Sequence, residues 1–126
     1  MIQNIFIIGI GSFLGGIFRF LLITLIKNNP LSLPWGTLSV NIFGCLVIGL
    51  LHALFERHHF GSPELRMFLT IGICGGFTTF SSFINELFHY LGENQYSLFF
   101  LYALSSFLGG LISLGIGYFM GKHLCA

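Results

Sequence analysis

The sequence predicts an all-α membrane protein with four transmembrane helices, the third of them broken near its middle. Of its 126 residues, 55% are hydrophobic and only 7% are charged, whereas a soluble domain carries about 25% charged residues. So few charges cannot cover a water-facing surface. Polar breaks divide the chain into four apolar segments, at residues 5–26, 35–55, 67–91 and 97–120. Each can span a hydrocarbon core of about 30 Å as a helix, and none shows the alternation of a barrel strand.

The first segment, residues 5–26, is apolar except for Arg19, which lies within GSFLGGIFRFLL. An arginine inside a membrane is costly, so it usually has a function or a partner. Two interpretations stay open. Arg19 lines a vestibule, or it bonds to a carbonyl of a neighbouring helix or reaches the interface.

The second segment, residues 35–55, carries Thr37 and Asn41 four residues apart, and Gly44 and Cys45 continue the same side. This spacing predicts a short polar face on one helix. The three cysteines of the chain, at positions 45, 74 and 125, show no CxxC spacing. We interpret them as two small buried hydrophobic residues and one residue near the C-terminus.

The third segment, residues 67–91, contains the stretch GICGGFTTFSSF (72–83). Glycine, threonine and serine disfavour a helix interior, so we expect a helix break here. A polar face at helical spacing follows it, made of Thr78, Ser81, Ser82, Asn85 and His89. Glu86 is the one acid within a span, and its place near the end of the segment predicts solvation at the interface, as for His89.

The fourth segment, residues 97–120, has a continuous row of small and hydroxyl residues: Tyr102, Ser105, Ser106, Gly109, Gly110 and Ser113. Any one serine or threonine can simply bond back to its own helix. Three polar faces in one small protein instead indicate a pathway lined by hydroxyls, one amide and aromatic edges. Such a lining donates hydrogen bonds without fixed charge, which suits a small anion.

Glycines recur in all four segments at spacings of three to five residues, and small residues let helices approach closely in membranes. They are Gly11, Gly15, Gly44, Gly49, Gly72, Gly76, Gly109, Gly110, Gly117 and Gly121. The charges that set orientation are few. Arg57, Arg66 and Lys122 lie on the side of both termini, and Lys27 lies on the other. This weak bias is compatible with insertion in both directions.

Three stretches closely resemble the bacterial fluoride channel family, called Fluc or CrcB. They are GSFLGGIFRF (11–20), GTLSVNIFG (36–44) and GICGGFTTFSSF (72–83). The resemblance covers essentially the whole chain, and TTFS-x-F after a double glycine is a specific motif. It implies passive, selective export of fluoride across the bacterial inner membrane, giving fluoride resistance. It also implies an antiparallel dual-topology homodimer with two pores and a structural Na⁺ at its centre.

The resemblance also implies the functional residues. It assigns the fluoride pore to Asn41, Phe80, Ser81, Phe83, Tyr102 and Ser106. It assigns the sodium ligands to the backbone carbonyls of Gly75 and Thr78, and carbonyl oxygens suit such a hard cation. Tyr102 and Ser106 resemble a polar track on the fourth span. The next helical position of that track is Gly110, where a serine would extend it.

Two other functions stay open. A coupled exporter of the small multidrug-resistance type also has four short spans, but it needs a carboxylate in the first span, where this chain has Arg19. A membrane scaffold that transports nothing is the other. An enzyme is not expected, because the chain has no HExxH or GxSxG motif. The net charge of +1 gives no case for nucleic acid as a partner.

Overall fold

The computed structural model describes residues 1–26, 33–57 and 61–124, and these form four long helical spans. The elements are α1 (Ile2–Leu25), α2 (Trp35–Arg57), α3 (Pro63–Met67), η1 (Phe68–Cys74), α4 (Gly75–Phe77), α5 (Phe80–Gly92) and α6 (Tyr96–Leu124). Together α3, η1, α4 and α5 make the third span, so the expected break in that span is confirmed. The largest differences from the expected bounds are at Pro63, expected at 67, and Leu124, expected at 120.

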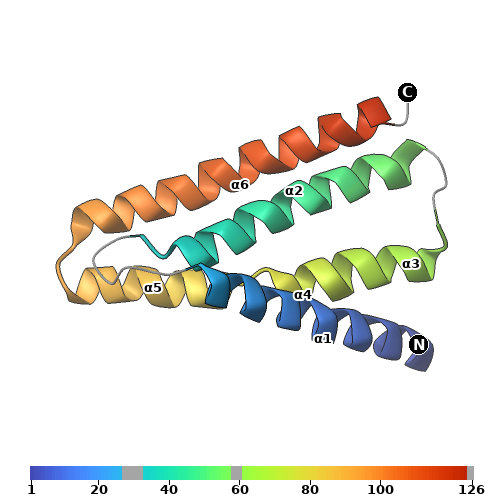
Figure 1. Cartoon of the computed structure of the whole chain (residues 1–126), viewed down its shortest axis with the longest axis horizontal. Helices are drawn as coiled ribbons and strands as arrows, with labels where there is room; N and C mark the ends of the chain where they lie inside the picture. Colours follow the sequence, from blue (N-terminus) through green and yellow to red (C-terminus); the bar gives the residue numbers. More distant parts are fainter. Residues whose placement is uncertain (27–32, 58–60, 125–126) are drawn as a thin grey trace.

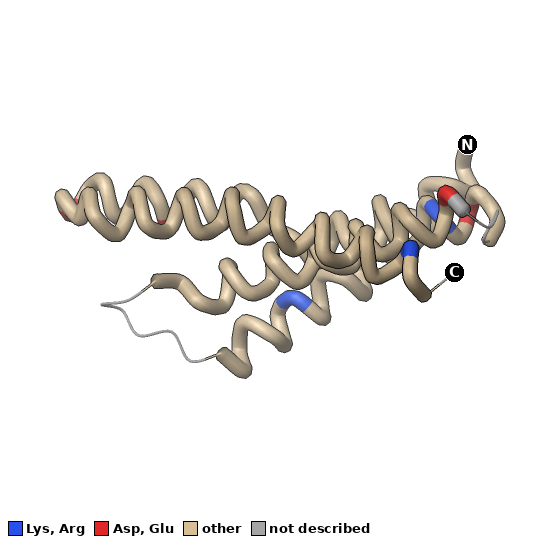
Figure 2. The backbone as a smooth tube through the Cα atoms, turned by 90° about the horizontal axis from the view of Figure 1, so that it is seen from above, with Lys and Arg blue, Asp and Glu red and all other residues tan. Residues whose placement is uncertain are grey.

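Each span is long and apolar enough to cross a membrane. Successive spans run in opposite directions, and both termini lie at the same end of the bundle (Figure 1). The spans form two layers, because α2 packs mainly on α6 while α1 packs on η1 and α4. Charged positions gather near the ends of the tube in Figure 2, and the basic position partway along α1 is Arg19.

The outside of the bundle is apolar and much of its tight interior is glycine. Large hydrophobic side chains such as Phe13, Phe88 and Phe107 are mostly exposed, whereas Tyr102 and Val40 are fully buried. This inverted pattern suits lipid, which gives no driving force to bury hydrophobic side chains, so close packing holds the helices together. The expected glycine packing is seen where the backbones of Gly11 and Gly72 meet.

The third span starts and restarts at two capped positions. At the start of α3, the Ser62 side chain accepts a hydrogen bond from the Leu65 N–H and so caps the helix. Pro63 is the first residue of this helix, a position that suits proline. At the start of α5, the Thr79 hydroxyl accepts a hydrogen bond from the Ser82 N–H and caps that helix in the same way. Between them, η1 has the wider π-helical winding, a form often found at functional sites. The sequence therefore gives the span two separate helix starts.

We expect Gly117→Ala to lower the thermal stability of the purified protein. Alanine favours a helix over glycine by about 0.5–1 kcal/mol. At Gly117, however, the added methyl group would overlap the Leu46 carbonyl of α2, and overpacking costs about 1–3 kcal/mol. The measurement is Tm in detergent solution, followed by intrinsic fluorescence.

Gly115→Ala is the matched control in the same helix, since a methyl group there meets nothing within 4 Å. Its Tm should equal or exceed that of the unmodified protein. Equal Tm values for the two alanine variants would show that close contact of α2 and α6 does not stabilise the fold.

Candidate functional site

The third span is interrupted at Thr78 and Thr79, whose backbones are extended (ψ 156° and ψ 109°). In a continuous helix the Thr79 N–H would donate to the Gly75 carbonyl. Instead it donates to Asn41 Oδ1 at 2.9 Å, and Asn41 Nδ2 donates to the Thr79 carbonyl at 3.1 Å. The Asn41 amide of α2 therefore provides hydrogen bonds for both backbone groups of Thr79. Inside a membrane, water is not present to provide them.

The break also changes the surroundings of two carbonyl oxygens. The Gly75 carbonyl loses the Thr79 N–H as its helical partner, and the Thr78 carbonyl accepts a hydrogen bond from Arg19 Nη1 at 3.2 Å. Of the two interpretations of Arg19, the contact favours the helix partner. Hard cations bind oxygen ligands, backbone carbonyls among them, and each carbonyl has two lone pairs.

A cavity of about 360 Å³ lies beside the break. Its lining comes from α2, the break, α5 and α6, and consists of Asn41, Gly44, Cys45, Ile48, Thr78, Thr79, Phe80, Phe83, Ser106 and Phe107. None of these side chains is charged. Asn41 Nδ2 has two hydrogens and gives one to Thr79, so the second can be donated to a molecule or ion in the cavity.

Phe80 and Phe83 bring two phenyl rings to this cavity, with centroids 5.9 Å apart and planes at 46°. The rings of Phe83 and Tyr102 pack in an edge-on arrangement, with their centroids 5.1 Å apart. Phe80 is 74% exposed and so projects away from its own chain. Because the edge of a phenyl ring is partially positive, both rings can face an anion.

The two serines assigned by resemblance differ in their surroundings. Ser106 lines the cavity, and its buried hydroxyl oxygen has no hydrogen-bond partner among the described residues. Ser81 is exposed and does not line the cavity, and its Oγ lies 3.5 Å from Thr79 Oγ1. Within one chain, therefore, the structure brings Ser106 rather than Ser81 to the cavity of Asn41.

Tyr102 belongs to a second polar group, centred on Glu86. The Tyr102 hydroxyl donates to Glu86 Oε2 and the Thr37 hydroxyl donates to Glu86 Oε1, both at 2.6 Å. Tyr102 and Thr37 are buried, and Glu86 is partly buried. Charge-assisted hydrogen bonds of this length are strong. The three residues join α2, α5 and α6 beyond Phe83.

The sequence-based interpretation of Glu86 as an acid solvated at the interface is wrong. Its carboxylate is held by two hydroxyls inside the bundle. The one signal in the sequence was that Glu86 is the sole acid within a predicted span, since nothing marked Thr37 and Tyr102 as its partners. His89 does fit its interpretation as a residue solvated at the interface. Its ring is exposed, and its Nε2 lies 3.2 Å from Glu93 Oε1.

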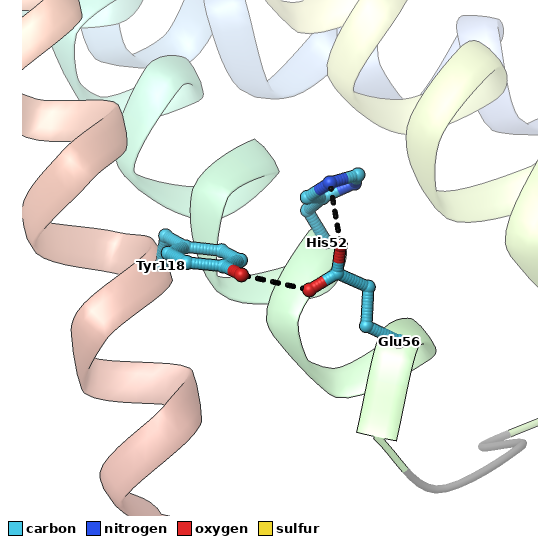
Figure 3. A network of polar contacts seen from close by, with 3 residues as sticks. All are labelled: His52, Glu56 and Tyr118. Atoms are coloured by element: carbon cyan, nitrogen blue, oxygen red, sulfur yellow. Dashed lines mark hydrogen bonds and ion pairs between the residues drawn. The ribbon is translucent and has the colours of Figure 1, made fainter.

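A further polar cluster lies at the opposite end of α2. Figure 3 shows His52 and Glu56 of α2 and Tyr118 of α6 pointing toward one another. Tyr118 donates to Glu56 Oε2 at 2.8 Å, and His52 Nε2 lies 3.4 Å from Glu56 Oε1. A second cavity, lined in part by His52 and Arg66, adjoins this cluster. These residues place polar groups at the end of the bundle that holds the termini.

Comparison with known proteins agrees with this architecture. Residues 6–118 match the family model described as CrcB-like protein, Camphor Resistance (CrcB). A protein of Phocaeicola vulgatus named fluoride-specific ion channel FluC is 38% identical over 95% of this chain and 99% of its own length. Proteins of the same name from Flavobacterium psychrophilum (97% of this chain, 99% of the relative) and Bacteroides fragilis (96% and 98%) are each 40% identical.

These matches run through all four spans and include the helix break and the residues around it. The four apolar helices and the channel relatives together make the chain a multi-pass membrane protein. The chain belongs to the CrcB family.

Proposed function

We propose that this chain is a fluoride-selective channel through which fluoride leaves the bacterial cytoplasm passively, which gives fluoride resistance. Family membership and the names of the relatives support this function. The observation that carries it is the uncharged cavity beside the helix break, whose lining includes amide and hydroxyl groups together with the phenyl rings of Phe80 and Phe83. Donors without fixed charge bind a small anion and also release it, as conduction requires.

The path would run from this cavity along α6 toward Glu86. Ser106 and Tyr102 are one helical turn apart, so their hydroxyls lie on one side of α6. The Ser106 hydroxyl has no hydrogen-bond partner among the described residues, whereas the Tyr102 hydroxyl donates a hydrogen bond to Glu86. For Tyr102 to donate to a passing anion, its hydroxyl must first release Glu86 Oε2.

A second copy in the opposite orientation would complete the path, with two pores in the resulting homodimer. Phe80 supports this arrangement, because its ring is 74% exposed on its own chain although it borders the most polar part of the third span. The weak charge bias between the two sides of the sequence is compatible with two orientations in one plasma membrane. In a two-fold dimer each ring would close the cavity of the partner.

A structural Na⁺ at the dimer centre is the remaining part of the proposal. The Gly75 and Thr78 carbonyls would hold it, two from each copy. The break supports this assignment, because it removes the helical partner of Gly75, a residue exposed on its own chain. The Arg19 guanidinium on Thr78 opposes a second cation nearby, so Gly75 is the stronger ligand of the pair.

The described first span, α1, does not favour a coupled exporter of the small multidrug-resistance type. Such a protein needs a carboxylate in its first span. Here α1 contains no acid, and its Arg19 is bonded to the Thr78 carbonyl.

In liposomes loaded with potassium fluoride, the purified protein should release fluoride rapidly once valinomycin carries the balancing K⁺. Liposomes loaded with chloride should retain it, because chloride is larger and binds weak donors less strongly than fluoride. Ion-selective electrodes measure both effluxes. Equal efflux of the two ions would overturn fluoride selectivity, and no efflux of either would favour a scaffold.

Phenylalanine variants test the aromatic lining in the same assay. Phe80→Ile should slow fluoride efflux at least tenfold, because the variant lacks the partially positive ring edge. Phe88→Ile is the matched control, since Phe88 is 71% exposed on α5 and does not line the cavity. If the two variants conduct equally well, the phenyl rings do not take part in conduction.

We expect Asn41→Leu to lower both Tm and fluoride efflux. The Thr79 N–H and carbonyl both lose the Asn41 amide, and each buried group left unsatisfied costs about 1–3 kcal/mol. Asn41→Asp keeps an acceptor for the Thr79 N–H but places a carboxylate in the path. It should therefore remain closer to the unmodified protein in Tm while losing efflux. A leucine variant with unchanged Tm would show that Asn41 does not hold the break.

Removing Na⁺ should reduce both the dimer fraction and fluoride efflux, and adding it back should restore them. The protein is purified and assayed in N-methyl-D-glucamine salts, with and without Na⁺, and photobleaching steps in liposomes count the copies. A K⁺ series controls for ionic strength. A stable, conducting dimer without Na⁺ would remove the ion from the proposal and leave the pore assignment standing.

A further inference from the structure

Cys45 lies on α2 one helical turn after Asn41 and lines the same cavity. It is a free thiol and only partly buried. A cysteine that served as a small hydrophobic residue in a sealed core would be buried on all sides, as Cys74 is. The placement of Cys45 therefore differs from the one that its apolar sequence context predicts.

Gly110 of α6 faces this thiol. A Cβ atom added at Gly110 would lie 3.3 Å from Cys45 Sγ, so the sulfur occupies the space beside the glycine. Gly110 follows Ser106 by one helical turn, and Ser106 follows Tyr102 by one turn. The row of hydroxyls on α6 thus has no side chain at its third position, and the thiol from α2 lies beside that position.

The second observation is the state of Ser106. Its hydroxyl oxygen is buried, lines the cavity and has no hydrogen-bond partner among the described residues. A buried hydroxyl normally has a partner, so Ser106 is the residue of this lining whose hydrogen bond is left unused among the described residues. Cys45 belongs to the same lining, and an S–H group is a weak hydrogen-bond donor.

The side of α2 that carries Cys45 continues to the polar cluster at the end of that helix. Ile48 lines both this cavity and the second cavity, which His52 and Arg66 also line. Cys45, Ile48 and His52 follow one another at i, i+3 and i+7, which is one helical face. His52 is exposed beside the polar cluster of Figure 3. Modification of Cys45 requires a water-soluble reagent to approach it from the end of the bundle that carries this cluster.

We propose that the Cys45 thiol lines the anion path as a donor beside Gly110 and forms a site where thiol-directed anionic reagents block conduction. This inference rests on the proposed channel function. The probe is 2-sulfonatoethyl methanethiosulfonate. The Cys45 thiolate attacks the sulfur that carries the sulfonatoethyl group. A disulfide forms, the bond from that sulfur to the sulfonyl group breaks, methanesulfinate leaves with the electron pair, and water takes the thiol proton.

The test is fluoride efflux from proteoliposomes before and after treatment with this reagent. The unmodified protein should lose at least tenfold in efflux, and dithiothreitol should restore it by reducing the disulfide. Cys45→Ser, which keeps a hydroxyl donor at this position, should show the same fluoride efflux before and after treatment with the reagent. It still contains Cys74 and Cys125, so its insensitivity assigns the block to Cys45. Cys74→Ser, which alters a buried thiol outside this cavity, should remain sensitive.

Two further readouts separate the possible failures. Mass spectrometry of the treated protein should show the reagent on Cys45. An unlabelled Cys45, or a labelled one with unchanged efflux, would overturn the inference while leaving the channel function intact. An unmodified protein that passes no fluoride before treatment would instead overturn the proposed function. Cys45→Ala, which lacks the donor, should conduct several-fold more slowly than Cys45→Ser, and equal rates would remove the donor role.

Discussion

The third span can be broken inside the membrane because Asn41 hydrogen-bonds the backbone of Thr79 at both its N–H and its carbonyl. Unsatisfied backbone groups cost several kcal/mol each in a lipid environment, about as much as a domain can lose. An amide carries its donor and its acceptor on separate atoms, so it can pair with a backbone N–H and a backbone carbonyl at the same time. A single residue of α2 therefore permits the break, and Arg19 of α1 supports it from the other side through the Thr78 carbonyl.

The break sets the direction of every side chain that follows it. The Thr79 hydroxyl accepts a hydrogen bond from the Ser82 N–H and so caps α5, which restarts the helix after the break. Phe80 and Phe83, which follow within one turn, both line the cavity, and Phe80 is mostly exposed. Gly44 lets α2 approach the break closely, because a side chain at this position would overlap the Thr78 methyl group. The cavity, its two phenyl rings and the loss of the helical partner of the Gly75 carbonyl thus accompany one local interruption.

Polarity along the interior changes in steps. Around the break, the lining consists of amide, hydroxyl, thiol, phenyl and aliphatic groups, none of which is charged. Beyond Phe83, the Glu86 carboxylate accepts hydrogen bonds from the hydroxyls of Thr37 and Tyr102. At the opposite end of α2, His52 and Glu56 form the exposed cluster with Tyr118. An anion crossing this chain would therefore meet neutral donors at the centre, where a fixed charge would either repel it or hold it too firmly.

The sequence by itself determined the four helices, the break and the polar faces, because composition, glycine content and helical spacing act locally. It also indicated Asn41 and Ser106 as lining residues through their faces. Only the tertiary structure decided which groups meet: the Thr78 carbonyl with Arg19, Glu86 with Tyr102, and Cys45 with the space beside Gly110. These pairs join residues that are far apart in the chain. Helical spacing gives the face of each residue on its own helix, whereas helix packing sets which faces come together.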